Sequence, residues 1–160
     1  MGYASHIGTL EAKGDIIIRT DADVFMTPSA ILEVVKVFNN NPKKLVATVG
    51  HIYYPLELST NIMAYIYDRY LRKPYNTTGY FIAFKRQIVD KLNFDPRLIA
   101  NDDWNFGARA LELLGLNSLH YNWRVTVLVS SRLIKKKGYL RYIMECLGII
   151  RIIPTPYSQL

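Results

Sequence analysis

The stretch that decides the expected fold is GDIIIRTDADVFMTP, residues Gly14–Pro28. Its three isoleucines, Ile16 to Ile18, are β-branched and contiguous, a pattern that predicts a strand buried on both faces of a parallel sheet. Two carboxylates, Asp21 and Asp23, follow at once and are separated by one alanine. Because ligands bind beyond the carboxyl ends of the strands in open α/β sheets, these acids stand where such a sheet would carry a site.

The spacing of the two acids favours a cation between them. Carboxylates this close repel each other unless a cation or a sugar hydroxyl intervenes, and a hard ion such as Mg2+ or Mn2+ shared with substrate phosphates would remove the conflict. The alternative is structural, because aspartate is also common in turns and at helix N-caps. The next residues favour a functional site, since Thr27 and Pro28 predict an N-cap and the start of a helix that reaches about Asn39.

Length and composition predict one domain with a substantial core, because the chain has 160 residues and half of them are apolar. The single cysteine, Cys146, excludes a disulfide within the chain and a metal site of the CxxC type. Residues 1–13 lack the basic and apolar parts of a signal peptide, and no run of about eighteen apolar residues predicts a membrane span. We therefore expect a cytoplasmic location.

Helix and strand patterns alternate along the chain, as an α/β fold requires. The acidic stretch, the helix after it and a second strand together predict one βαβ unit with a right-handed crossover. The predicted helices are 1–13, 28–39, 62–70, 86–92 and 101–114, and the predicted strands are 16–18, 45–50, 79–85 and 119–129.

A second acidic cluster, Asn101-Asp102-Asp103-Trp104, opens the predicted helix 101–114. One interpretation is structural: acids at a helix N-terminus interact favourably with the helix dipole, by roughly 0.3 to 1 kcal/mol each. The other is catalytic, because a carboxylate beside a second acid and an aromatic ring is suited to act as general base on an acceptor hydroxyl. We expect the helix to turn Phe106, Ala110 and Leu113 inward.

Four blocks of sequence, in order, carry a resemblance to a known family. The blocks are AKGDIIIRTDADVFMTP (12–28), TGYFIAFKR (78–86), NDDWNFGARALELLG (101–115) and VSSR (129–132). Together they resemble the family 2 glycosyltransferases of the GT-A fold, over nearly the whole chain to about residue 132. The resemblance implies a truncated, Rossmann-like mixed sheet flanked by helices. It also implies inverting transfer of a sugar from a nucleotide-sugar donor to a hydroxyl acceptor, with Mn2+ or Mg2+ bridging the donor diphosphate.

On the donor side, the resemblance implies roles for three residues. Asp23 would ligate the metal, and Asp21 would contact the donor ribose or the metal. Arg132 would reach the diphosphate, to which the guanidinium fork is suited. His120 is a candidate third metal ligand, with a buried and satisfied histidine as the alternative.

On the acceptor side, Gly79 and Tyr80 would lie in a loop where glycine allows close approach of the backbone. The family pattern E-D-x-D-L-x-x-R places Asp102 at its Glu, Asp103 at the general base and Arg109 at its final Arg, whereas Asn105 departs from its last acid. Trp104 would stack on an acceptor sugar, with simple packing as the alternative.

The family carries a nucleotide-binding half before the acidic strand, where this chain has only about fourteen residues. We expect the acidic strand to lie at an exposed sheet edge as a result. A truncated product, a missing half supplied by another polypeptide, and a homo-oligomer are the three explanations. For each of them, we expect the isolated chain to bind nucleotide-sugar weakly or not at all.

The positive charge is concentrated in the tail. Six basic residues against Glu145 give the segment from Arg132 onward +5 of the total +7. We therefore divide the chain into a partial GT-A domain, 1–132, and a basic amphipathic tail, 133–160, whose helical pattern runs over 138–153. That helix would either pack on the core or lie on an anionic membrane, peripherally at its inner face, which would suit a lipid-linked acceptor as well as a glycan.

Two other classes of function are weighed against the transferase. The first is a degenerate transferase domain that acts as a non-catalytic interaction scaffold. It is distinguished by whether Asp21, Asp23 and Asp103 converge on one crevice. The second is nucleic-acid binding, which we do not expect because the basic residues of the tail interleave with aliphatic residues and form no stacking platform.

Overall fold

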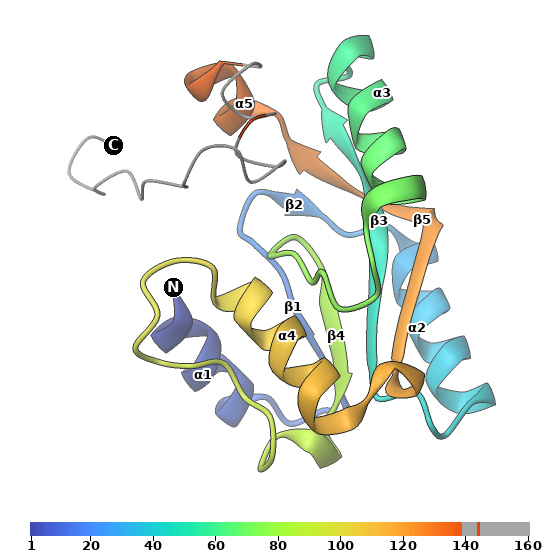
Figure 1. The fold of residues 1–160 in the computed structure, drawn as a ribbon, viewed down its shortest axis with the longest axis vertical. Coiled ribbons are helices and arrows are strands. Elements are labelled where there is room, and N and C mark those ends of the chain that lie inside the picture. The colour runs from blue at the N-terminus through green and yellow to red at the C-terminus, as the bar shows by residue number, and fades with distance from the viewer. Residues whose placement is uncertain (139–143, 145–160) are drawn as a thin grey trace.

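A mixed five-stranded sheet forms the centre of the computed structural model, which describes residues 1–138 and residue 144 (Figure 1). The strands are β1 (Ile16–Arg19), β2 (Val24–Phe25), β3 (Val46–Tyr54), β4 (Ile82–Lys85) and β5 (Leu119–Ser130), in the spatial order β1-β4-β3-β5-β2. The α-helices are α1 (Gly2–Glu11), α2 (Pro28–Asn40), α3 (Leu58–Ile66), α4 (Asp102–Leu114) and α5 (Arg132–Lys137). A π-helical turn, Tyr67–Leu71, continues α3, and two 3-10 turns lie at Arg86–Ile88 and Leu116–Ser118.

The sheet lies between two helical layers, with α1 and α4 on one face and α2 on the other (Figure 1). Strand β4 serves both layers because successive side chains of a strand point to opposite faces. Ile82 and Phe84 join the cluster that contains Phe106 of α4, whereas Ala83 joins the cluster that contains Val34 of α2. The expected α/β architecture, a mixed sheet flanked by helices, is therefore confirmed.

Strand β1 differs from its prediction in its pairing. It runs antiparallel to β4, with Ile17 opposite Phe84, and is not part of a parallel pair. The reason is that β4 inserts between β1 and β3, which run parallel to each other but do not touch. The predicted burial of all three isoleucines is wrong, since only Ile17 is fully buried. The reason is that β1 is an edge strand, the position expected from the family resemblance.

The predicted helix after the acidic pair is confirmed as α2. Its N-cap is Thr27, whose Oγ1 accepts a hydrogen bond from the Ala30 N–H at 3.3 Å. Helix α4 also lies where it is predicted, with Phe106 and Ala110 buried. The inward placement of Leu113 is wrong, since its side chain is 54% exposed. The buried stripe continues instead at the i+4 position, Leu114, which packs against the core.

The region before Gly79 contains more structure than its sequence predicts. Strand β3 continues through Tyr54, four residues past the predicted end at Gly50, and is parallel to β5. The register of this pair shifts at Gly50, where a Cβ would come within 2.6 Å of the Trp123 carbonyl. Glycine is therefore needed where the two strands approach at this irregularity.

Helix α5 straddles the boundary that the sequence places between 132 and 133. Its Ile134 is buried in a cluster with Tyr53 and Ala64. The helix predicted over 138–153 lies outside the described residues. Within the part of the chain that the structure describes, no helix has both the length and the apolar character to cross a membrane.

Candidate active site

The loop after β1 brings one predicted acid into a semi-buried position and leaves the other accessible. Asp21 Oδ1 accepts a hydrogen bond from Arg19 Nη1 at 2.8 Å. Burial raises the pKa of Asp21, and the charges of Asp23 and Asp102 act in the same direction against the opposing effect of Arg19. Asp21 thus sits among other carboxylates, which is the electrostatic setting of a cation site.

Asp23 lies beside the end of β5, where the structure also places Arg132. The Asp23 carbonyl accepts a hydrogen bond from the Ser130 N–H at 3.2 Å. The side chains of Arg132 and Asp23 approach to 3.9 Å between Nη2 and Oδ2, and both are accessible to solvent. The structure thereby brings together the two residues that the sequence assigns to the metal and the diphosphate.

Gly79 connects the donor-side acid to the acceptor-side acid. Its carbonyl accepts a hydrogen bond from Arg19 Nη1 at 2.5 Å, and its N–H donates to Asp103 Oδ2 at 2.6 Å. A Cβ at this position would lie 2.6 Å from Asp21 Oδ2 and would overlap the Arg19 guanidinium. Glycine therefore allows this close approach, and a Cβ here would have to displace the Arg19 and Asp21 side chains from their contacts.

Asp103, the predicted base, is held at the start of α4 by two backbone amides. The N–H groups of Gly79 and Trp104 donate to its two carboxylate oxygens, at 2.6 and 2.9 Å. Burial raises the pKa of Asp103, and Asp102 adds to this, whereas the two amides and Arg19 oppose it. A carboxylate with a raised pKa and a fixed orientation is suited to accept a proton.

Asp102 points away from solvent and into the protein. Its Oδ2 accepts a hydrogen bond from Ser5 Oγ of α1 at 2.8 Å and lies 3.6 Å from Arg19 Nη2. Its side chain is only 2% exposed. Asp102 is therefore buried behind the site, whereas the adjacent Asp103 is only partly buried.

Arg19 and Ser5 also belong to the site, although neither is predicted from the sequence. Arg19 had a usable signal, because a charged residue ends an otherwise apolar strand two positions before an acid. Ser5 had none, since a serine in an N-terminal helix is unremarkable and its partner Asp102 lies 97 positions away.

Tyr80 and Trp104 occupy different environments. The Tyr80 side chain is buried and its hydroxyl receives a hydrogen bond from Arg72 Nη1 at 2.5 Å. Its ring contacts the His51 ring at a tilt of 34°, with centroids 4.6 Å apart. Its hydroxyl thus belongs to an internal network and not to an acceptor surface. The Trp104 side chain is 47% exposed next to Asp103, so its ring is available for stacking.

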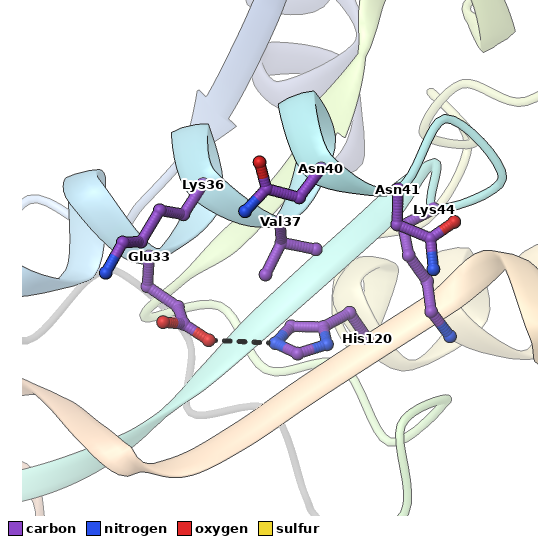
Figure 2. Close-up of a pocket in the computed structure, with 7 residues that line it drawn as sticks. All are labelled: Glu33, Lys36, Val37, Asn40, Asn41, Lys44 and His120. Carbon is purple, nitrogen blue, oxygen red and sulfur yellow. Dashed lines mark hydrogen bonds and ion pairs between the residues drawn. The ribbon is translucent and has the colours of Figure 1, made fainter.

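His120 is not brought to the acidic pair. Figure 2 shows that the His120 side chain points toward Glu33 between α2 and β5. His120 Nε2 and Glu33 Oε1 are hydrogen-bonded at 3.0 Å, and both residues line a pocket of about 400 Å³. The same Glu33 oxygen accepts a hydrogen bond from Asn122 at 2.8 Å. His120 stands near the start of β5, whereas Asp23 contacts Ser130 at its end. His120 is therefore not placed to act as a third metal ligand beside Asp23.

Oxygen atoms of the sugar-donor substrate would have to complete any metal site at Asp21 and Asp23. Among residues 1–138 and 144, no group of three or more His, Cys, Asp and Glu side chains is placed to hold a metal ion. Asp21 and Asp23 offer hard carboxylate oxygens, which suit Mg2+ or Mn2+ when substrate phosphates supply further ligands.

The sequence profile described as Glycosyl transferase family 2 matches residues 1–93. The chain belongs to glycosyltransferase family 2. The matched part of this family 2 glycosyltransferase includes β1, the acidic loop and Gly79, and ends before α4. A comparison with curated proteins found no match.

Solved structures similar to this family 2 glycosyltransferase share its fold. Glucosyl-3-phosphoglycerate synthase from Mycobacterium tuberculosis, in complex with phosphoglyceric acid, is 17% identical with a TM-score of 0.59, over 97% of this chain and 56% of that one. A mannosyltransferase from Pyrobaculum calidifontis, in complex with GDP-Man and Mn2+, is 16% identical with a TM-score of 0.56, over 96% of this chain and 45% of that one.

A third similar structure is mannosyl-3-phosphoglycerate synthase from Rubrobacter xylanophilus. It is 13% identical, with a TM-score of 0.54 over 98% of this chain and 55% of that one. The family 2 chain therefore spans about half the length of the solved proteins that it resembles.

Proposed function

We propose that this chain carries the catalytic and acceptor-side part of an inverting transferase that moves a sugar from a nucleoside diphosphate to a hydroxyl group. The observation that carries the proposal is the convergence at Gly79. Its amide donates a hydrogen bond to Asp103, and a Cβ at this position would lie 2.6 Å from Asp21 Oδ2. Acids from two distant sequence blocks thus meet at one loop, which favours chemistry over a scaffold that merely keeps the fold.

Each side chain has a defined task in this proposal. Asp103 accepts the proton of the acceptor hydroxyl as that oxygen attacks the sugar, and its two backbone amide donors hold it in orientation. Asp21 and Asp23 bind the donor and a divalent cation, with Arg132 beside Asp23 for the diphosphate. The cation, Mn2+ or Mg2+, would stabilise negative charge on the departing diphosphate.

The similar structures support this choice of substrates without identifying them. The mannosyltransferase is in complex with GDP-mannose and Mn2+, and a further structure of the Mycobacterium tuberculosis synthase is in complex with UDP-glucose and Mn2+. For this chain we propose a nucleoside diphosphate hexose as donor and a hydroxyl of a glycan or of a lipid-linked sugar as acceptor. Trp104, exposed beside Asp103, would stack on the acceptor sugar.

Substitution of the base tests the proposal. Asp103→Asn should lower sugar transfer at least a thousandfold, because the amide cannot take the proton, while donor binding stays within about threefold of wild type. Transfer is measured with Mn2+ and a panel of nucleotide sugars, and donor binding by calorimetry. Glu112→Gln, an exposed carboxylate on the same helix, is the matched control and should have no effect. Normal turnover of Asp103→Asn would show that Asp103 is not the base.

For the basic tail we propose peripheral contact with an anionic membrane, which would bring the site to a lipid-linked acceptor at the inner face. Its charge and apolar stripe motivate this proposal. Flotation with anionic liposomes tests it against a chain that ends after Gly138, which retains α5. Equal flotation of the two chains would count against the proposal.

A further inference from the structure

Arg19 stands between the two halves of the site. It is the last residue of β1, and its side chain is only 11% exposed. Four other segments of the chain supply its partners. Arg19 Nη1 donates to Asp21 Oδ1 at 2.8 Å and to the Gly79 carbonyl at 2.5 Å. Its Nη2 lies 3.6 Å from Asp102 Oδ2, and its Nε donates to Ser5 Oγ at 3.4 Å.

These partners belong to opposite sides of the proposed reaction. Asp21 is a donor-side acid, whereas Asp102 neighbours the base on the acceptor side. The Gly79 carbonyl is part of the peptide segment whose amide donates to Asp103. One guanidinium therefore touches the donor-side acid, the acceptor-side helix and the loop that joins them.

The geometry points to Arg19 as a positioning residue that couples the two halves of the active site, an inference that rests on the proposed function. Its bond to Asp21 Oδ1 fixes the carboxylate plane, and the second oxygen, Oδ2, faces Gly79. Its bond to the Gly79 carbonyl sets the orientation of that residue and hence of the amide that holds Asp103. Arg19 touches no reacting atom in this scheme and acts through Asp21 and Gly79.

Only arginine can fill this role. The guanidinium presents its donors in a rigid planar fork, so that Nε, Nη1 and Nη2 reach partners on different sides at once. Lysine would keep the positive charge, but its single ammonium group sits at the end of a flexible stem and cannot hold the same set of partners. Arg19→Lys thus separates positioning from charge, and Arg19→Gln removes both.

Arg86 supplies a matched control at the other end of β1. Its guanidinium also ties loops together, with Nε donating to the Gly14 carbonyl at 2.9 Å and Nη2 donating to the Ala12 carbonyl. Both partners are backbone carbonyls that precede β1, whereas the acidic pair follows the other end of that strand. Arg86→Gln should therefore affect stability without affecting the site.

The first measurement needs no activity. Amide hydrogen exchange over residues 78–81 should become at least tenfold faster in Arg19→Lys and Arg19→Gln than in wild type, because the Gly79 amide loses its alignment with Asp103. Exchange in α2 and β5 should stay unchanged in Arg19→Lys, which shows that the variant is folded. Arg86→Gln should leave the 78–81 segment unchanged. Unchanged protection of this segment in both Arg19 variants would overturn the inference.

The second measurement uses the transfer reaction. Both Arg19 variants should lower kcat about a hundredfold, the size of effect expected when reacting groups shift by about 1 Å, while KM for the acceptor changes less than threefold. The loss should be clearly smaller in an Asp103→Asn background, because the part that acts through Gly79 and the base is already absent there, whereas the part that acts through Asp21 remains. Full kcat in Arg19→Lys, or an equal loss in both backgrounds, would overturn the inference. If wild type transfers no sugar, the proposed function fails while the exchange experiment still decides the role of Arg19.

Discussion

At the scale of single residues, Gly79 is a position of the site that leaves no room for a Cβ beside Arg19 and Asp21. Every other amino acid would place a Cβ within 2.6 Å of Asp21 Oδ2 and into the Arg19 guanidinium. Its neighbours are charged groups that bond to one another, so relief of the overlap would break the contacts that orient both acids. A single missing carbon atom therefore allows the donor-side and acceptor-side acids to share one loop.

Gly79→Ala is expected to lower the free energy of unfolding by about 1 to 3 kcal/mol and to abolish sugar transfer, because the added methyl group overpacks the site. Urea unfolding and the transfer assay measure the two effects. Gly8→Ala is the control: Gly8 is exposed on α1 with open space around its Cβ position, and alanine there should stabilise the helix by about 0.5 to 1 kcal/mol. A Gly79→Ala enzyme with wild-type activity would contradict the close approach.

The protonation state of Asp103 predicts how activity depends on pH. Burial raises the pKa of this carboxyl above its ordinary value of 3.8, and the nearby Asp102 raises it further. A general base must be ionised, so kcat/KM should rise with pH through the raised pKa and level off above it. The pH profile checks this, and an acidic limb at or below the ordinary value would contradict it.

At the scale of elements, the π-helical turn after α3 carries a buried ionic network. Asp68 Oδ2 accepts a hydrogen bond from the His51 amide at 2.7 Å, and Oδ1 lies 3.3 Å from Arg72 Nη1. Arg72 also donates to the Val49 carbonyl at 2.8 Å and to Tyr80. The turn therefore ties β3 to the loop that contains Gly79, so its integrity matters for the site.

Asp68→Asn should reduce the free energy of unfolding by about 3 kcal/mol, because it leaves the buried Arg72 charge without its counterion. Chemical denaturation at neutral pH measures this loss. Asp95→Asn is the control, since Asp95 pairs with the exposed Arg97 at the surface and its loss should leave stability nearly unchanged. Equal stability of Asp68→Asn and wild type would contradict a stabilising network.

The effect of Asp68 should also depend on pH in a defined direction. Burial alone would raise the pKa of Asp68, but the hydrogen bond and charge of His51 and the charge of Arg72 outweigh it and lower the pKa below 3.8. A lowered pKa stabilises the fold fully above the ordinary value, and this contribution disappears as pH falls through the pKa of the folded state. The difference in stability between wild type and Asp68→Asn should therefore shrink below about pH 4.

At the scale of the whole molecule, the sheet ends at β1, the strand that carries the acidic loop. The chain spans about half the length of the solved proteins that share its fold. Because the acids and Arg132 contact the metal and the diphosphate in our proposal, they account for only part of a nucleotide sugar. These residues alone therefore supply only part of the affinity for a nucleotide sugar in our proposal.

We expect the chain alone to bind a nucleoside diphosphate weakly in the presence of Mn2+, with a dissociation constant on the order of 1 mM or higher. Calorimetry with UDP and GDP measures this, and omission of Mn2+ is the control for metal dependence. Tight, metal-dependent binding with a micromolar dissociation constant would contradict the expectation and would mean that this chain holds the whole donor.

The sequence by itself determined most of the helices and strands, and it supplied the residues on which the proposed chemistry rests. The run of isoleucines, the Thr27-Pro28 start of α2 and the acids at the start of α4 act through local propensity and capping, which neighbours in the sequence set. These signals predicted β1, α2 and α4. The order of the sequence blocks that contain Asp21, Asp23 and Asp103 indicated the family.

Only the tertiary structure decided which of these residues meet. In the structure, β1 pairs antiparallel with β4, and His120 lies at the end of β5 away from Asp23. The Tyr80 side chain points inward, and Arg19 lies between the two acidic clusters. The physical reason is that these contacts join residues far apart in the chain, such as Arg19 with Gly79 or Ser5 with Asp102. Strand order and burial set such contacts, and local propensity carries no record of either.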